Sequence, residues 1–312
     1  MRTVTRLSAG RRGNGLLTVF VFHKVLQQKS AFYPDIPDQS EFAQILDWIE
    51  EQFNVIRLSD AVDGLDTGML PVRAAAITFD DGNGETLAYA TPVFDEKRIP
   101  ATFFVNTAYL EGGEPFFERI FKAFELATAP SLDLTNIGEG IVSLESPLQR
   151  RAAADRLCER AKYMFPSDAE AFANQIVESS QLDASVRMVS RQELLAKRCS
   201  WIDFGGHSHH HAILTTLDSS AAEREIQTCK HLISDLTGNN APLFAYPNGK
   251  PGKDFTAEHE GMIRSAGFKA AFATSHGAMK QTDNRFSAPR FTAWDKSCLK
   301  FQLRMLMNLI RS

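Results

Sequence analysis

The chain has 312 residues, of which 44% are hydrophobic and 23% are charged, and its formal net charge is −4. This composition is typical of a soluble globular protein, and the length suits two average domains or one α/β barrel. The mildly acidic balance argues against a nucleic-acid partner, which usually requires a basic face, and against a polyanionic substrate.

Short apolar runs rich in β-branched or aromatic residues recur along the chain and predict strands. In chain order they cover residues 16–22, 54–58, 74–79, 101–105, 201–204, 242–246, 269–273 and 288–292. Most of the gaps between them, such as 41–53 and 219–237, carry apolar residues at helical spacing. Strand and helix alternation of this kind predicts a mostly parallel sheet, either open or closed into a barrel.

One connection differs from the others. Residues 111–191 are helical and charged in composition, and the only strand-like run is a weak one at 141–144. We expect a mostly helical insertion within a single domain that covers residues 1–312. The last fifteen residues are expected to form a helix packed on the domain, with attachment to a membrane surface as the alternative.

The ends of the chain and the cysteines indicate a location. The N-terminal arginines precede the run 16–22, which leads directly into His23 with no small-residue cleavage site, so we expect no signal peptide. The cysteines are widely separated and are expected to be free thiols of a reducing compartment. They are Cys158, Cys199, Cys229 and Cys298. We therefore expect a cytoplasmic protein whose membrane contact is at most peripheral.

Polar residues suited to chemistry follow several predicted strands directly. Asp80 and Asp81 follow the run 74–79, and His207 follows Trp-Ile-Asp-Phe-Gly-Gly. Asn248 and His276 follow the strands predicted at 242–246 and 269–273. Because the carboxyl ends of parallel strands meet at one edge, where active sites of α/β folds assemble, we expect these side chains to lie close together.

The segment His-Ser-His-His-His at 207–211 places two histidines four residues apart. Such a pair can face one way on a helical turn, and imidazole is the commonest metal ligand, although histidine-rich loops are also common on surfaces. A carboxylate from Asp80 or Asp81 would complete a set with open positions for substrate. Asp-Asp-Gly is also an ordinary turn sequence, whose carboxylates could be solvated or could cap a helix.

Several of these motifs resemble those of the polysaccharide deacetylases, the NodB-like carbohydrate esterases. Thr-Phe-Asp-Asp-Gly at 78–82 and His-Ser-x-x-His at 207–211 resemble the first two motifs of that family, and Phe-Ala-Tyr-Pro-Asn-Gly at 244–249 resembles a variant of the third. The segments 101–105 and 22–25 resemble its third-strand segment and the opening of one subgroup. The resemblance implies a distorted (β/α)7 barrel, which is TIM-like.

The resemblance also implies roles for individual residues. It makes Asp80 the catalytic base, and it makes Asp81, His207 and His211 the ligands of a divalent metal, most often zinc. Cobalt, nickel or iron would suit the same ligands. Asn248 occupies the position of a family tyrosine, and its backbone N–H would hold the oxyanion. Tyr246, in the same motif, is a further candidate for substrate contact.

The sequence departs from the family pattern at two functional positions. Ala245 stands where the family often has an arginine that orients the base, and we expect Arg290 to replace it, with a purely structural arginine as the alternative. The family histidine that protonates the leaving amine has no clear match. His276 is the nearest candidate, and otherwise Asp80, once protonated, would return the proton itself. His23 either supports the reacting groups or packs at the barrel rim.

The expected activity is metal-dependent removal of an N-acetyl group from an amino sugar of a saccharide or glycan precursor. The same residues would suit a deformylase or another amide hydrolase acting on a sugar-linked amine. The departure at Ala245 also leaves open a catalytically inactive carbohydrate-binding homologue.

Overall fold

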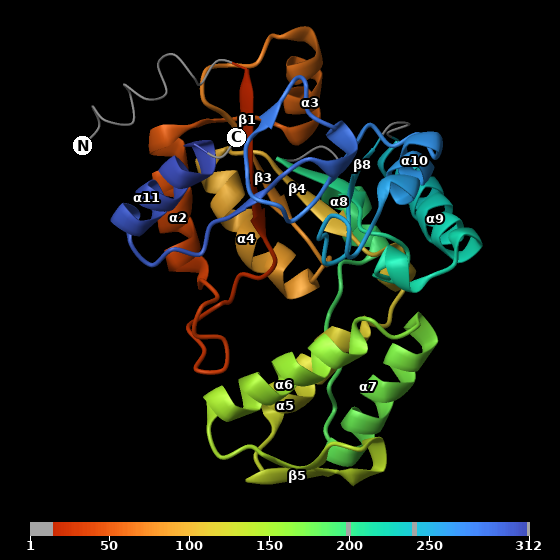
Figure 1. Cartoon of the computed structure of the whole chain (residues 1–312). Coiled ribbons are helices and arrows are strands. Elements are labelled where there is room, and N and C mark those ends of the chain that lie inside the picture. Colours follow the sequence, from red (N-terminus) through yellow and green to blue (C-terminus); the bar gives the residue numbers. More distant parts are fainter. Residues whose placement is uncertain (1–14, 198–200, 239–241, 311–312) are drawn as a thin grey trace.

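A curled, mostly parallel sheet forms the centre of the computed structural model, which describes residues 15–197, 201–238 and 242–310 (Figure 1). Its main row of parallel strands is β1 (Leu16–Phe22), β3 (Ala74–Phe79), β4 (Ala101–Val105), β7 (Ile202–Gly206), β8 (Leu243–Ala245) and β9 (Ala270–Phe272). Every residue of β3 and β4 is buried, as expected for parallel strands covered on both faces. The short β2 (Asn54–Val55) pairs with the start of β3, and β10 (Met279–Lys280) runs antiparallel to β1.

The last strand brings the two ends of this row together. β11 (Phe291–Thr292) pairs in parallel with β1, and Ala288 just before it bridges to Phe272 of β9. Residues 288–292 therefore hydrogen-bond to both edges of the row and complete a distorted, TIM-like barrel. The predicted α/β barrel is confirmed.

Helices surround the sheet. They are α2 (Gln39–Gln52), α3 (Leu58–Thr67), α4 (Gly84–Lys97), α8 (Arg191–Lys197), α9 (Ser219–Thr237), α10 (Ala257–Ser265) and α11 (Cys298–Ile310). Single 3-10 turns lie at Thr107–Tyr109, Thr135–Ile137, Leu214–Thr216 and Arg285–Ser287. Helix α2 shows how the sequence specifies them: Asp38 and Glu41 form a capping box at its start, and Phe42, Ile45 and Ile49 turn one face into the core. Helix α11 packs beside α2, with Phe301 near the ring of Trp48.

The predicted helical insertion lies at the end of the barrel where the parallel strands finish (Figure 1). It contains α5 (Phe116–Leu126), a hairpin of β5 (Ser131–Leu134) and β6 (Gly140–Ser143), α6 (Pro147–Ala161) and α7 (Pro166–Ser180). Its helices share a hydrophobic cluster that also takes in Phe32 and Tyr33 from the loop after β1. The mostly helical character is confirmed, and the weak strand signal at 141–144 belongs to the hairpin. Whether the chain is a single domain stays a prediction.

Four predicted strands are shorter in the structure, and those at 242–246 and 269–273 lose one residue at each end. The run 54–58 ends after Val55, because Leu58 already begins α3. The run 288–292 is a regular strand only at Phe291–Thr292, and Pro289 within it has no N–H to contribute to a ladder.

Other expectations concern the termini and the cysteines. No helix among the described residues is long and apolar enough to cross a membrane. Cys158, Cys229 and Cys298 are free thiols, whereas Cys199 and the N-terminal arginines lie outside the described residues.

Candidate active site

A cavity of about 320 Å³ lies between the carboxyl ends of the strands and the insertion. Segments that follow β1, β3, β7, β8 and β9 form its barrel side, and α5 and α6 form the opposite side. The residues that line it are His23, Asp80, Asp81, Phe116, Phe117, Phe121, Asp155, Cys158, Glu159, Lys162, His207, His211, Ile213, Asn248 and Thr274. Most of the predicted site residues therefore meet in one place.

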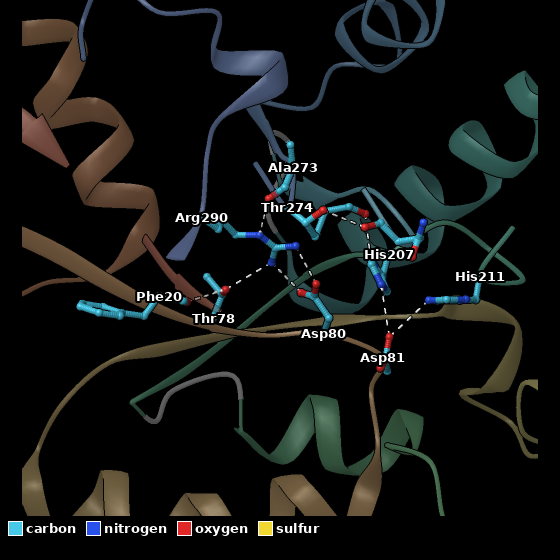
Figure 2. A network of polar contacts seen from close by, with 11 residues as sticks. Phe20, Thr78, Asp80, Asp81, His207, His211, Ala273, Thr274 and Arg290 are labelled. Carbon is cyan, nitrogen blue, oxygen red and sulfur yellow. Dashed lines mark hydrogen bonds and ion pairs between the residues drawn. The ribbon is translucent and has the colours of Figure 1, made fainter. Parts of the chain in front are cut away.

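Asp81, His207 and His211 converge on one point (Figure 2). The Nε2 atoms of His207 and His211 lie 3.4 Å and 3.3 Å from the same oxygen, Oδ1 of Asp81. Burial alone would raise the pKa of Asp81, but hydrogen bonds from the two histidines hold it well below its usual range. Asp81 is thus a carboxylate facing two imidazole nitrogens, a donor set typical of divalent transition metals.

The tautomer of His207 suits a ligand. Its Nδ1 lies 2.8 Å from the backbone oxygen of Ala245, and because a carbonyl only accepts, Nδ1 must donate. In the neutral form that binds a metal, the proton on Nε2 is absent, and the lone pair of Nε2 then lies on the side of the ring that faces Asp81. Two glycines precede His207 because the strand packs closely there: a Cβ on Gly205 would lie 2.6 Å from the ring of Phe104.

Asp80 and Arg290 form a buried ion pair beside this point (Figure 2). Nη1 and Nη2 of Arg290 donate to the two oxygens of Asp80 at 2.7 and 2.6 Å. Arg290 also donates through Nε to the carbonyl of Ala273, and Nη1 lies 3.3 Å from the hydroxyl of Thr78. Burial would raise the pKa of Asp80, but the charge of Arg290 lowers it, so the carboxyl is ionised. Arg290 therefore lies where its predicted role of orienting the base requires it.

Four of the site residues have left-handed backbone conformations. Asp81, Ser208, His211 and Asn248 have φ angles of 72°, 58°, 59° and 58°. This region costs a residue other than glycine about 1–2 kcal/mol and is often found at functional sites. The segment 207–211 is accordingly an irregular turn, so the expectation of a single helical turn is wrong, although both histidines still face Asp81.

Glu225 of α9 holds this irregular turn. One of its oxygens accepts hydrogen bonds from the backbone N–H groups of His209 and His210, at 2.9 and 2.8 Å. Its other oxygen lies 2.7 Å from Nδ1 of His210, and Nδ1 of His209 contacts the hydroxyl of Thr107. His209 and His210 are thus engaged away from Asp81, in support of the turn.

Asn248 lies in a turn that is fixed by its own side chain. Its amide donates to Oδ2 of the buried Asp254 at 2.5 Å, and the hydroxyl of Thr274 donates to its backbone oxygen at 2.9 Å. Tyr163 of the insertion donates from its hydroxyl to the other oxygen of Asp254. Among the described residues no acceptor contacts the backbone N–H of Asn248, and Asn248 is one of the residues that line the cavity.

Three predicted residues do not line the cavity: Arg290, which contacts the lining residue Asp80, and also Tyr246 and His276. Tyr246 is buried in the core, where its hydroxyl donates to the carbonyl of Phe286 and its ring stacks on Phe255, so it is not placed for substrate contact. His276 is exposed and lies outside the cavity lining.

His23 lines the cavity, and strand register explains its position. Phe22 of β1 pairs with Phe79 of β3, and the N–H of Asp80 donates to the carbonyl of Phe22. The next residue of each strand, His23 and Asp80, therefore lie side by side. In the sequence, the position of His23 directly after the first predicted strand was the feature that could have identified it as a site residue. The insertion residues Phe117 and Lys162 carried no comparable local signal.

Comparisons with known proteins agree with this geometry. A family model described as polysaccharide deacetylase matches residues 68–128 and 187–271. These ranges contain Asp80, Asp81, His207, His211 and Asn248, and they leave out 129–186, which holds most of the insertion. A search of curated proteins found no match.

The fold is similar to that of several solved deacetylases. The deacetylase PplD of Streptococcus pyogenes, solved in complex with acetate, has a TM-score of 0.62 and 14% identity over 93% of this chain and 97% of its own. IcaB of Ammonifex degensii has a TM-score of 0.58 and 19% identity, over 93% and 98%. At these identities the likeness speaks for the fold. With the matching family model and the same barrel, the chain belongs to the polysaccharide deacetylase family.

Proposed function

We propose that this protein is a metal-dependent deacetylase that removes an N-acetyl group from an amino sugar of a saccharide. The observation that carries the proposal is the convergence of Asp81, His207 and His211 beside a second, ionised carboxylate, Asp80. A pure binding site for sugar needs neither the three ligands nor a buried base held by Arg290.

The residues present fit a divalent cation. Two imidazole nitrogens and one carboxylate oxygen lie within 4.8 Å of one another, and the Nδ1–carbonyl contact of His207 leaves its Nε2 free to bind. Zinc is the ion most often held by such a set. When bound, the ion would polarise the carbonyl of the amide as a Lewis acid.

Asp80 is the proposed base that takes the proton of the attacking water. Its pair with Arg290 supplies fixed orientation and keeps the carboxylate ionised, while each oxygen retains a lone pair for a further hydrogen bond. The cavity lies directly against this carboxylate. Orientation, rather than a raised basicity, is what Arg290 contributes.

Asn248 is the proposed oxyanion donor, through its backbone N–H. The left-handed turn at Asn248 is held from two sides by Asp254 and Thr274, so the N–H is fixed before substrate arrives. A donor preorganised in this way stabilises charge that develops only in the transition state.

His23 is the proposed donor of a proton to the leaving amine. It lies beside Asp80 in the cavity lining, whereas the sequence candidate, His276, lies outside it. Return of the proton by Asp80 itself remains the alternative.

The test combines metal analysis with release of acetate from a neutral N-acetylglucosamine oligosaccharide, before and after treatment with a chelator. Asp81→Ala and His207→Ala should lose the metal, whereas Asp80→Asn should keep it and lose turnover. His231→Gln, on the exposed face of α9, is the matched histidine control. A metal-loaded protein that binds the oligosaccharide but releases no acetate would refute the proposal. If the protein released only formate, from an N-formyl analogue, the substrate's acyl group would be formyl and not acetyl.

A further inference from the structure

The insertion forms the wall of the cavity that faces the proposed metal centre. Phe117 and Phe121 of α5 contribute to it, together with Asp155, Cys158 and Glu159 of α6 and Lys162 at its end. Cys158 and Glu159 lie three and four positions after Asp155, and Lys162 lies three positions after Glu159, so these residues share one face of the helix. Helix α6 lies outside both ranges matched by the family model.

The aromatic part of the wall begins at the proposed ligands themselves. The ring centre of Phe117 lies 4.6 Å from that of His211. Glu118 connects helix α5 to the barrel and is only 3% exposed. Its carboxylate accepts hydrogen bonds from Lys24 at 2.8 Å and from the side-chain amide of Asn83 at 3.1 Å. Asn83 in turn caps α4 just after Asp80 and Asp81. The wall is therefore held at a fixed distance from the reacting groups.

The polar part of the wall consists of charges that are already balanced. Asp155 pairs with Arg151 at 2.9 Å, and Glu159 pairs with Lys162. The side chains of Asp155 and Glu159 are 51% and 61% exposed, so their oxygens can accept hydrogen bonds from a ligand. Lys162, which is 19% exposed, offers a donor next to them.

Charge then decides which ligand this wall accepts. The cavity lining contains four carboxylates, Asp80, Asp81, Asp155 and Glu159, and a single lysine, Lys162. Arg290 offsets Asp80, and the proposed metal would offset Asp81. Arg151 and Lys162 pair with Asp155 and Glu159, so the wall offers no uncompensated positive charge to a phosphate or carboxylate on the substrate. Aromatic rings beside hydrogen-bonding groups suit the apolar face and the hydroxyls of a sugar ring instead.

We propose that α5 and α6 form the substrate-recognition wall of this cavity and that it accepts an uncharged saccharide. A sugar ring packs on Phe117 and Phe121, and its hydroxyl groups bond to Glu159, Asp155 and Lys162. The inference rests on the proposed function, because it places this sugar next to the one that carries the acetyl group. The volume of about 320 Å³ is at the small end of ligand pockets, so the wall contacts a short stretch of saccharide.

The experiment measures binding and turnover separately. Binding of a neutral N-acetylglucosamine pentasaccharide to metal-loaded Asp80→Asn is followed by calorimetry, and turnover is measured in the otherwise unchanged chain. Glu159→Ala and Lys162→Met should each weaken binding and raise KM about tenfold, as expected for the loss of a charged hydrogen bond. The kcat and the metal affinity, determined by chelator competition, should not change. Arg156→Gln is the matched control, since Arg156 lies on the same helix, pairs with Glu139 and does not line the cavity.

A second arm tests the preference for an uncharged ligand. The same pentasaccharide with 6-phosphate groups should have a lower kcat/KM than the neutral one. The double variant Asp155→Asn/Glu159→Gln should reduce this difference in kcat/KM between the two saccharides. Equal use of both saccharides, or α6 variants that match the Arg156→Gln control, would overturn the inference. Binding that depends on α6 without any release of acetate would support the wall and refute the proposed hydrolysis, so the two failures are distinguishable.

Discussion

The guanidinium of Arg290 donates to both carboxylate oxygens of Asp80, although the two residues are 210 positions apart in the sequence. Arg290 belongs to residues 288–292, which pair with β9 on one side and with β1 on the other and so complete the barrel. At position 245, where the sequence departs from the expected motif, Ala245 contributes the backbone oxygen that fixes His207. The segment with the last strand thus supports Asp80, the proposed base, and β8 supports His207, a proposed ligand.

Replacing Arg290 with methionine should impair both folding and turnover. The change leaves the Asp80 carboxylate buried without a partner, which costs about 3–5 kcal/mol of unfolding free energy. Adding Asp80→Asn should recover much of that stability but none of the activity, because the base is then absent. Urea unfolding and acetate release, measured on the single and double variants, check this. Equal stability of wild type and Arg290→Met would contradict the buried pair.

His23 and His276 should respond differently to substitution. His23→Gln should lower kcat by about 10²–10⁴-fold, the usual contribution of a positioned acid. His276→Gln should leave kcat within about twofold of the wild-type value, since the exposed His276 does not line the cavity. Both proteins should retain the metal, which confirms that they are intact. The reverse order of effects would restore His276 as the acid.

Glu225 gives a prediction about pH. Burial would raise the pKa of this carboxyl, but hydrogen bonds from the side chain and backbone of His210 lower it. A carboxyl whose pKa is lowered by folding stabilises the protein at pH values above its unfolded pKa, about 4.3, and this contribution is lost as pH falls through the folded pKa. Glu225→Gln should therefore be about 1–3 kcal/mol less stable than wild type at pH 7.

Near pH 3 the two proteins should approach each other in stability. Denaturant unfolding at a series of pH values measures the difference, and Glu223→Gln, an exposed position two residues earlier on α9, is the control. A difference that is constant from pH 7 to pH 3 would show that protonation of Glu225 does not weaken the turn at 207–211.

Much of the barrel and of the site was accessible from the sequence, for identifiable physical reasons. Buried parallel strands are continuous apolar runs, so 74–79 and 101–105 were found with their exact ends. Asp80, Asp81 and His207 each follow the end of a predicted strand, and this position predicted correctly that they lie in one cavity. The pairing of Arg290 with Asp80 was anticipated from an empty position in the third motif.

What the sequence could not supply depends on long-range packing. Tyr246 follows a strand just as Asn248 does, but its ring turns into the core and stacks on Phe255, a contact made by tertiary structure alone. The left-handed φ angles at Ser208 and His211 break the helical turn that the spacing suggested, and the backbone N–H groups between them donate to Glu225 of the distant helix α9. Along the sequence, α6 follows the hairpin and is far from the strand that precedes Asp81. No local pattern therefore relates Glu159 to Asp81.

The backbone role proposed for Asn248 can be separated from that of its side chain. Glycine adopts a φ of 58° without strain, so Asn248→Gly should keep the N–H in place, although the contact with Asp254 is lost. We expect its kcat to stay within about tenfold of wild type. Asn248→Pro, which has no N–H and a φ fixed near −65°, should lower kcat by at least about 10²–10³-fold, the cost of one oxyanion donor. Metal content and unfolding midpoint, measured on both variants, separate loss of the donor from loss of the fold. If Asn248→Gly were as inactive as Asn248→Pro while both kept the metal, the side chain and not the backbone N–H would be the group that matters.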